Sequence, residues 1–146
     1  MVRVVLQRVS QASVQVEGET VAEIERGLLL LVGIDVQDTA DLVKRMADRI
    51  AVMRVFEDDA GKVNVATRDA GGKMLVVSQF TLLADTSRGR SPSFVRAARP
   101  EVATELIDLF VHRLQDSGYR VEEGHFGAHM DVSLVNDGPF TLVLES

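Results

Sequence analysis

The chain has 146 residues, 46% of them hydrophobic, and its 16 basic and 22 acidic residues give a net charge of −6 at neutral pH. Length and hydrophobic content predict one globular domain over residues 1–146 and exclude an intrinsically disordered chain, while the acidic balance argues against a general nucleic-acid binder. The chain has no cysteine, which excludes disulfides and thiolate catalysis and is typical of a cytoplasmic enzyme.

The first third of the chain predicts strands and then a helix. Residues 2–9, 12–17 and 20–25 alternate between apolar and polar side chains, as half-buried strands do. Residues 27–34, "GLLLLVGI", form a continuous apolar run that predicts a central strand buried on both faces and is far too short to span a bilayer. We therefore expect no membrane segment. Asp38 is expected to cap the following helix, whose buried face is expected to carry Leu42, Met46, Ile50 and Met53.

The rest of the chain alternates between strands and one more helix. Residues 73–85, "KMLVVSQFTLLAD", predict a strong strand, and three strand-like segments end the chain. Pro100 is expected to open a second helix that ends near Gly118, with a buried stripe made of Val102, Leu106, Leu109, Phe110 and Leu114. This order predicts an α+β fold: a single domain with a mostly antiparallel β core of barrel-like sheets and two main helices.

Two short motifs interrupt strand patterns. Residues 78–81, "SQFT", place polar side chains within the apolar strand at 73–85. Residues 136–141, "NDGPFT", suit a hairpin turn between two strands, but proline follows the glycine where a strand needs an N–H group. A polar strand edge and a loose turn are the simplest interpretations of the two motifs.

Patterns for metal or cofactor chemistry are weak. His125, His129 and Asp131 would share one face of a strand, so a metal-dependent hydrolase is one alternative, but no further acid or histidine completes a ligand set. No G-x-S-x-G, P-loop or G-x-G-x-x-G pattern is present. We therefore expect no metal and no cofactor.

One segment is strongly basic. Residues 86–100 contain four arginines and no acid. A solvated loop is the simplest interpretation, and a local contact with phosphate is the alternative. Three of the arginines are the candidates for that contact: Arg88, Arg90 and Arg96.

Five stretches of sequence together resemble one known family. They are "VLQRVSQASV" (5–14), "VVSQFTL" (76–82), "SPSF" (91–94), "GHFGAHM" (124–130) and "VSLVNDGPFTL" (132–142). Nearly the whole chain thereby resembles the D-aminoacyl-tRNA deacylase family, also called D-tyrosyl-tRNA deacylase, whose S-Q-x-T and N-x-G-P-x-T motifs are both intact. Ser91 departs from the basic residue that relatives carry before "PSF", which bears on tRNA affinity and not on the chemistry.

The resemblance implies a homodimeric enzyme that hydrolyses the ester between a D-amino acid, or glycine on a non-cognate tRNA, and the acceptor end of tRNA. The catalytic motif would be Ser78, Gln79, Phe80 and Thr81. The N–H groups of Phe80 and Thr81 are our candidates for stabilising the oxyanion, since no base lies beside Thr81 in sequence.

The resemblance also implies a cis bond between Gly138 and Pro139, which would reach from one subunit into the active site of the other as a chiral gate. Arg8 would brace that loop. The substrate pocket would have an apolar wall made of Phe126, Ala128 and Met130, for which plain core packing is the simpler alternative.

Two further alternatives stay open at this point. A related hydrolase of the same fold would act on another ester, such as L-alanine on a non-cognate tRNA. A non-catalytic RNA-binding module would show no turnover.

Overall fold

The structure of the protein, a computed structural model, describes all residues from 1 to 146. Its elements, in chain order, are β1 (Arg3–Val16), β2 (Glu19–Ile24), β3 (Gly27–Gly33), α1 (Ala40–Val52), β4 (Arg54–Glu57), β5 (Val63–Ala66), β6 (Lys73–Ser78), the short 3₁₀ helix η1 (Phe80–Leu83), α2 (Pro100–Asp116), β7 (Val121–Glu123) and β8 (Asp131–Glu145). No helix among them is long and apolar enough to cross a lipid bilayer.

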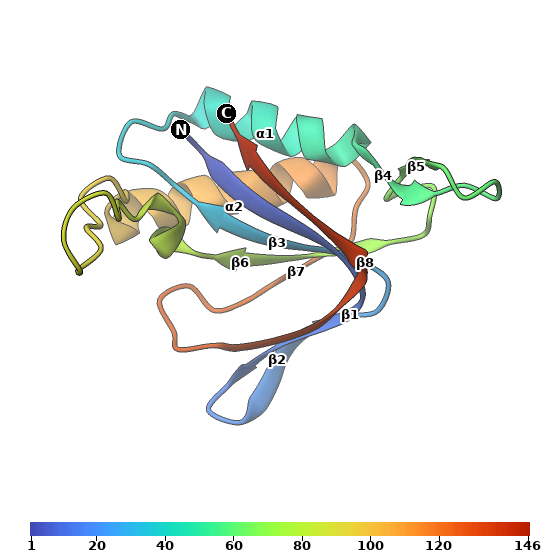
Figure 1. The fold of residues 1–146 in the computed structure, drawn as a ribbon, viewed down its shortest axis with the longest axis horizontal. Helices are drawn as coiled ribbons and strands as arrows, with labels where there is room; N and C mark the ends of the chain where they lie inside the picture. Colours follow the sequence, from blue (N-terminus) through green and yellow to red (C-terminus); the bar gives the residue numbers. More distant parts are fainter.

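A six-stranded curved sheet forms the body of the molecule (Figure 1). Its strand order is β2-β1-β3-β6-β7, and β8 also pairs with β1. The β1 pairings with β2, β3 and β8 are antiparallel, whereas β6 is parallel to both β3 and β7. The predicted α+β domain with a mostly antiparallel, barrel-like core is therefore confirmed.

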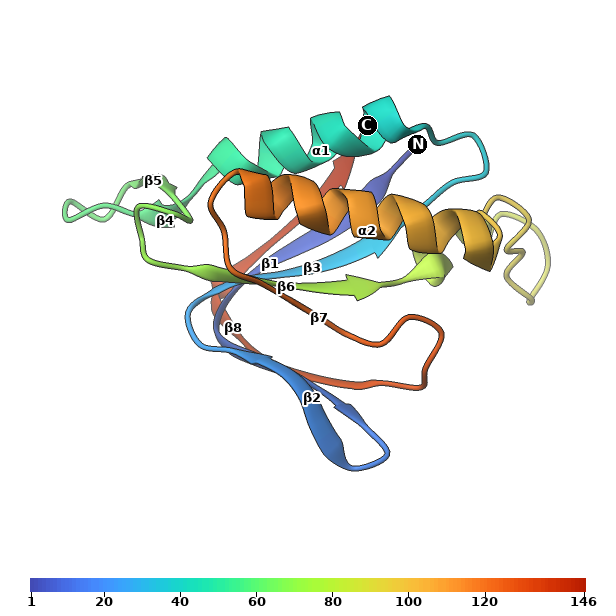
Figure 2. The ribbon, with the colours of Figure 1, turned by 180° about the vertical axis from the view of Figure 1, so that it is seen from behind.

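The two helices lie side by side on one face of the sheet (Figure 2). Leu28 and Leu30 of β3 belong to the large hydrophobic core under the helices, while Leu29 belongs to a smaller core on the other face. This alternation confirms that 27–34 contains a strand buried on both sides. Because β3 and β6 pair in parallel, their carboxyl ends lie at the same edge of the sheet, near the start of α2 (Figure 2).

The helix boundaries and faces differ in detail from the prediction. Asp38 is not the cap of α1: Thr39 is, and its hydroxyl accepts the Leu42 N–H at 3.3 Å. Asp38 instead accepts the Asp35 N–H at 2.7 Å, and its carboxylate lies 3.4 Å from the Met1 ammonium. The buried faces are shifted around the helices and comprise Val43, Met46, Ala47, Ile50 and Ala51 in α1, and Ala103, Ile107, Phe110, Val111 and Leu114 in α2.

Three strand predictions differ from the structure. Residues 2–9 and 12–17 are not separate strands but parts of the single bent strand β1. The strand predicted over 73–85 stops at Ser78, where the chain turns into η1. The segment 124–130 is not a strand but a loop with a turn at Gly127, whose φ is +78°.

Candidate active site

A cavity of about 600 Å³ is lined by residues from the end of β6, from η1 and from the start of α2. Figure 2 shows that these segments lie at one end of the molecule. Ile34 forms part of the cavity, and three further segments supply the rest. They contribute Val77, Ser78, Gln79 and Phe80; Phe94, Ala97, Ala98, Arg99, Pro100 and Ala103; and Phe126, Gly127, Ala128, His129, Met130 and Val132. The predicted pocket residues and most of the predicted catalytic motif therefore share one cavity.

The predicted catalytic motif begins at Ser78, the last residue of the central strand β6. Gln79 donates its backbone N–H to the Val32 carbonyl at 2.8 Å, and the chain then turns away from the sheet into η1. Gly33 permits this turn, because a Cβ there would lie 2.5 Å from Leu83 Cδ2 and 3.0 Å from the Gln79 carbonyl. The sheet thus fixes where η1 begins.

The first two N–H groups of η1 are free. Neither Phe80 nor Thr81 donates its backbone N–H to another group of the chain, as expected for the first turn of a helix. The Thr81 hydroxyl accepts a short hydrogen bond from the Gln79 side-chain amide and has no acid, lysine or histidine partner. Thr81 itself is exposed and is not among the residues that line the cavity.

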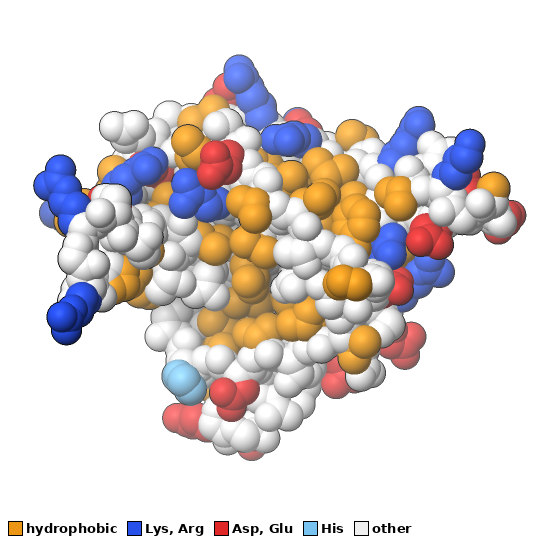
Figure 3. All heavy atoms as spheres, in the orientation of Figure 1, with side chains coloured by type: hydrophobic (Ala, Val, Ile, Leu, Met, Phe, Trp, Pro, Cys, Tyr) orange, Lys and Arg blue, Asp and Glu red, His pale blue; other side chains and the backbone are white.

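Three phenylalanines surround the cavity with partly exposed rings. Phe80, Phe94 and Phe126 are 55%, 39% and 40% exposed, and the first two meet edge to face with ring centroids 5.2 Å apart. Apolar rings in this state are available to stack on a flat ligand. Figure 3 shows hydrophobic side chains gathered over the middle of the molecular face on which β8 lies.

The motif "NDGPFT" is a bulge in β8 and not the hairpin that its composition suggested. Gln7 of β1 pairs with Thr141 and Val9 pairs with Asn136, so four residues of β8 face Arg8 alone. The Asn136 side chain closes the base of the bulge, since its amide donates to Thr141 Oγ1 and its oxygen accepts the Phe140 N–H, both at 2.7 Å. A hairpin and a bulge share turn residues, and only the partner strand distinguishes them.

Gly138 and Pro139 occupy the tip of this bulge. Their peptide bond is cis, as the resemblance implied. Both residues are exposed, and neither lines the cavity of its own chain.

Arg8 of β1 holds the bulge in place. Arg8 is 5% exposed, and its guanidinium donates to the Asp137 carbonyl at 2.9 Å and to the Val55 carbonyl at 2.8 Å and lies 4.8 Å from the centre of the Phe140 ring. A buried guanidinium that donates two hydrogen bonds holds in place the backbone that carries Gly138.

The three predicted phosphate-binding arginines divide into two groups. Arg88 and Arg90 are exposed on a loop closed by mutual backbone hydrogen bonds between Asp85 and Ser93, and neither forms an ion pair. Arg96 instead donates to Asp35 Oδ2 at 2.5 Å. A buried carboxylate therefore holds the Arg96 guanidinium, while about half of the side chain stays exposed.

Asp35 makes a testable contribution to stability. Burial alone would raise its pKa, but the Gln37 N–H, Arg96 and the Met1 ammonium hold the pKa of this carboxyl below its ordinary value of 3.8. A lowered pKa stabilises the fold above the unfolded-state pKa, and this contribution disappears as the pH falls through the folded-state pKa. We expect Asp35→Asn to lower the free energy of unfolding by about 1–3 kcal/mol at neutral pH.

The same difference should shrink as the pH falls below 3.8. Urea denaturation of both proteins across the acid range measures it. Asp41→Asn is the matched control, because Asp41 lies on the exposed surface of α1 in an ion pair with Arg45. A difference that stays constant down to the lowest pH would contradict the assignment.

The structure does not place His125, His129 and Asp131 on one strand face, the arrangement that suggested a metal site. Residues 124–130 form a loop, and His129 Nε2 lies 3.8 Å from Asp131 Oδ1 with both side chains exposed. No group of three or more potential ligands of this kind is close enough to hold a metal ion.

Known proteins resemble this chain along its whole length. The profile of the D-Tyr-tRNA(Tyr) deacylase family matches residues 5–145. The chain belongs to this family. A D-aminoacyl-tRNA deacylase of Lactobacillus delbrueckii subsp. bulgaricus is 55% identical over 143 residues, 98% of this chain and 99% of the relative. That of Brevibacillus brevis is 54% identical over 144 residues, 99% of each chain.

Among solved structures, the c-Myc DNA unwinding element binding protein is 40% identical and has a TM-score of 0.92, with 99% of this chain and 98% of that chain covered. The family membership agrees with the resemblance carried by the two short motifs. Sequence reasoning did not find the cavity wall at Phe94, Ala97 and Ala98, which belongs to no helix or strand. Its one signal was the "PSF" stretch within the resemblance.

Proposed function

We propose that this protein is a D-aminoacyl-tRNA deacylase, which hydrolyses the ester of D-aminoacyl-tRNA to a free D-amino acid and tRNA. One observation carries the proposal: two unpaired N–H groups, at Phe80 and Thr81, begin η1 beside a cavity surrounded by aromatic rings. The names of relatives more than half identical to the chain support the same activity.

The reaction is an acyl transfer to water. Water adds to the ester carbonyl, the carbonyl oxygen becomes negative, and the bond to the ribose oxygen then breaks as that oxygen takes up a proton. The N–H groups of Phe80 and Thr81 would stabilise the negative oxygen, which is commonly the largest single catalytic contribution. The ribose 2′-hydroxyl beside the ester would assist the proton transfer.

Thr81 suits the role of an organiser better than that of a nucleophile. A threonine nucleophile needs a base to take its proton, and the Thr81 hydroxyl has only the Gln79 amide as a partner. Because that amide donates to the Thr81 oxygen, the hydroxyl proton remains available for water or substrate. Gln79, in turn, would anchor the substrate, and Ser78 would fix the end of β6.

The cavity suits the unpaired acceptor end of tRNA. Proteins bind single-stranded ends by stacking bases on apolar and aromatic side chains, which needs few phosphate contacts. Phe126, Ala128 and Met130 would form the wall for the terminal adenine. A net charge of −6 is compatible with this mode of binding.

The chiral gate is proposed to come from a second copy of the chain in a homodimer. Gly138 and Pro139 project from β8 without entering the cavity of their own chain, and Val135 and Val143 of the same strand expose apolar side chains. In a partner's cavity, backbone carbonyls of the gate would bind the substrate amine. An L side chain would then clash with this backbone, whereas a D side chain, or glycine, would pass.

We place this activity in the cytoplasm, where aminoacyl-tRNA is made and used. The test compares hydrolysis of D-tyrosyl-, L-tyrosyl- and glycyl-tRNA under multiple turnover, with and without EDTA. We expect the D and glycyl esters to be hydrolysed in both conditions and the L ester to be spared.

Each alternative predicts another result of the same test. A non-catalytic RNA-binding module would show no turnover, and a metal-dependent hydrolase would lose activity in EDTA. A relative specific for another ester, such as L-alanine on a non-cognate tRNA, would spare D-tyrosyl-tRNA. Chromatography with mass measurement tests the dimer separately.

Arg88 and Arg90 are proposed to contact tRNA phosphate, and this predicts a weak dependence of binding on salt. The slope of log K against log salt is about −0.7 for each single-strand phosphate neutralised and about −0.9 for each duplex phosphate. Replacing both arginines with alanine should make the slope shallower by about that amount for each phosphate that is no longer neutralised. Arg45→Ala, on the exposed surface of α1, is the control. A slope unchanged in the double variant would contradict the proposed role of the two arginines.

A further inference from the structure

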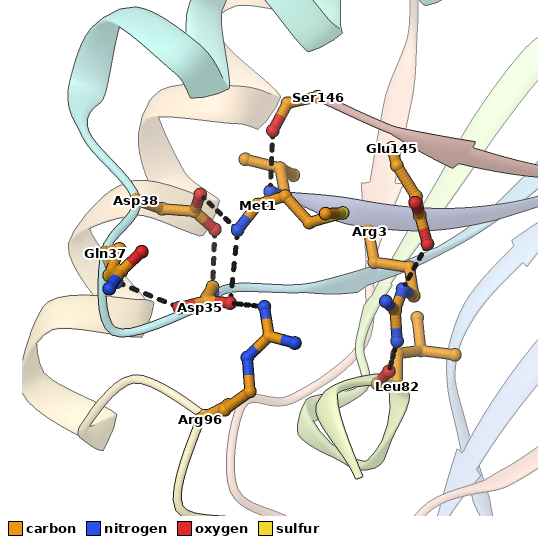
Figure 4. Close-up of polar contacts among 10 residues, drawn as sticks. Met1, Arg3, Asp35, Gln37, Asp38, Leu82, Arg96, Glu145 and Ser146 are labelled. Atoms are coloured by element: carbon orange, nitrogen blue, oxygen red, sulfur yellow. Dashed lines mark hydrogen bonds and ion pairs between the residues drawn. The ribbon is translucent and has the colours of Figure 1, made fainter. Parts of the chain in front are cut away.

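A cluster of charges follows the end of β3, with two buried carboxylates, those of Asp35 and Asp38, and two half-exposed cations, those of Arg96 and Met1 (Figure 4). Asp35 is 2% exposed, and its carboxylate receives hydrogen bonds from Arg96 Nη2 at 2.5 Å and from the Gln37 N–H at 3.0 Å. The Met1 ammonium lies 3.1 Å from the same carboxylate and 3.4 Å from that of Asp38. Two carboxylates thus meet two cations, and the loss of Arg96 leaves one buried negative charge in excess.

Backbone hydrogen bonds join the same two segments. The Val36 N–H donates to the Arg96 carbonyl at 2.8 Å, and the Ala98 N–H donates to the Ile34 carbonyl at 2.9 Å. This isolated antiparallel bridge between Asp35 and Ala97 belongs to no sheet. The segment 94–98 is therefore attached to the end of β3 by one short bridge and one ion pair.

The segment that is attached in this way forms one wall of the cavity. Phe94, Ala97 and Ala98 line it, as does Ile34 on the other side of the bridge, whereas Asp35 and Arg96 do not. The ion pair consequently lies outside the substrate space, and Phe94 reaches the Phe80 ring of η1 from the wall that it supports.

We infer that Asp35 and Arg96 are positioning residues, which hold the 94–98 wall in place for the terminal nucleoside of the acceptor end. The inference rests on the proposed function, since it names what the wall binds. The ion pair touches no reacting atom, and the N–H groups assigned to the oxyanion belong to η1 and not to the wall. Loosening the wall should therefore weaken substrate binding and leave the chemical step nearly unchanged.

The test uses Arg96→Met, which keeps the aliphatic stem and removes the charge, and Arg96→Lys, which keeps the charge. For D-tyrosyl-tRNA we expect KM to rise about fivefold to tenfold in Arg96→Met, with kcat within about twofold of the wild type. Arg96→Lys should recover at least half of that change on a logarithmic scale, because an ammonium also pairs with Asp35. Arg45→Met, which breaks the exposed Asp41–Arg45 ion pair on α1, should change neither constant.

Amide hydrogen exchange gives a readout that does not depend on activity. Peptides covering 34–36 and 94–98 should exchange faster in Arg96→Met than in the wild type, and should not do so in Arg45→Met. If Arg96→Met fails to fold, the double variant with Asp35→Asn removes both charges together and takes its place.

Three outcomes would overturn the inference. They are an unchanged KM despite faster exchange, a loss confined to kcat, and unchanged exchange in the 94–98 peptides. Failure of the proposed function is distinguishable, because the wild type itself would then release no D-tyrosine, and the positioning role would fall with it.

Discussion

Phe80→Pro is expected to lower kcat for D-aminoacyl-tRNA about 10²–10³-fold relative to Phe80→Ala, the usual loss when one oxyanion donor is removed. Proline has no N–H group, so it deletes one of the two donors that begin η1. Phe80 is the first residue of that helix, the position at which proline is best tolerated and at which no hydrogen bond within the chain is lost. Single-turnover rates measure the effect on the chemical step.

Phe80→Ala is the matched control because it removes the same ring and keeps the N–H group. It should raise KM, since stacking of a base on an aromatic ring contributes about 1–3 kcal/mol, and should change kcat little. Circular dichroism and the melting temperature show whether the proline variant keeps its fold. Equal kcat values for a folded proline variant and the alanine variant would rule out the Phe80 N–H as an oxyanion donor.

Gly138→Ala is expected to reduce the preference for D over L esters by about tenfold or more, measured as the ratio of the two kcat/KM values. A Cβ at this position would lie 2.8 Å from the Phe140 nitrogen and 3.2 Å from Arg8 Nη2, and the backbone φ of +144° disfavours a side chain as well. The bulge must therefore shift away from Arg8, and the proposed gate shifts with it.

Gly61→Ala separates this effect from the general strain of a side chain at positive φ. Gly61 has φ of +78° in the turn between β4 and β5, and a Cβ added there would meet no atom within 4 Å. The substitution should lower stability without changing the ratio of D to L hydrolysis. An unchanged ratio in a folded Gly138→Ala protein would remove Gly138 from the gate.

Features decided by local sequence pattern could be predicted well. The apolar run at 27–34 and the alternation over 2–9 identify strands because side-chain periodicity depends only on neighbouring residues. Pro100 marks the start of α2 for an equally local reason. The motif at 78–80 and the apolar residues of 126–130 were likewise found, and the structure brings them to one cavity.

Features decided by distant partners could not be predicted. Asp38 has the composition of a helix cap, yet its carboxylate faces the ammonium of Met1 at the start of the chain. The bulge at 136–141 has the composition of a hairpin turn, and its true form depends on pairing with β1. The local sequence around Arg96 indicated only a possible phosphate contact and gave no sign of its ion pair with Asp35, 61 residues away.

The pairing of β1 with β8 affects how the chain reaches its fold. β1 is synthesised before every other strand and β8 after every other strand, yet the two pair from Arg3↔Glu145 to Gln15↔Asp131. Pairing of such remote segments slows folding, since closing the long intervening loop costs conformational entropy before any contact between the two strands can form. A nascent chain arrested before residue 131 would present the β8-facing edge of β1 unpaired, and an unpaired strand edge is a site of aggregation.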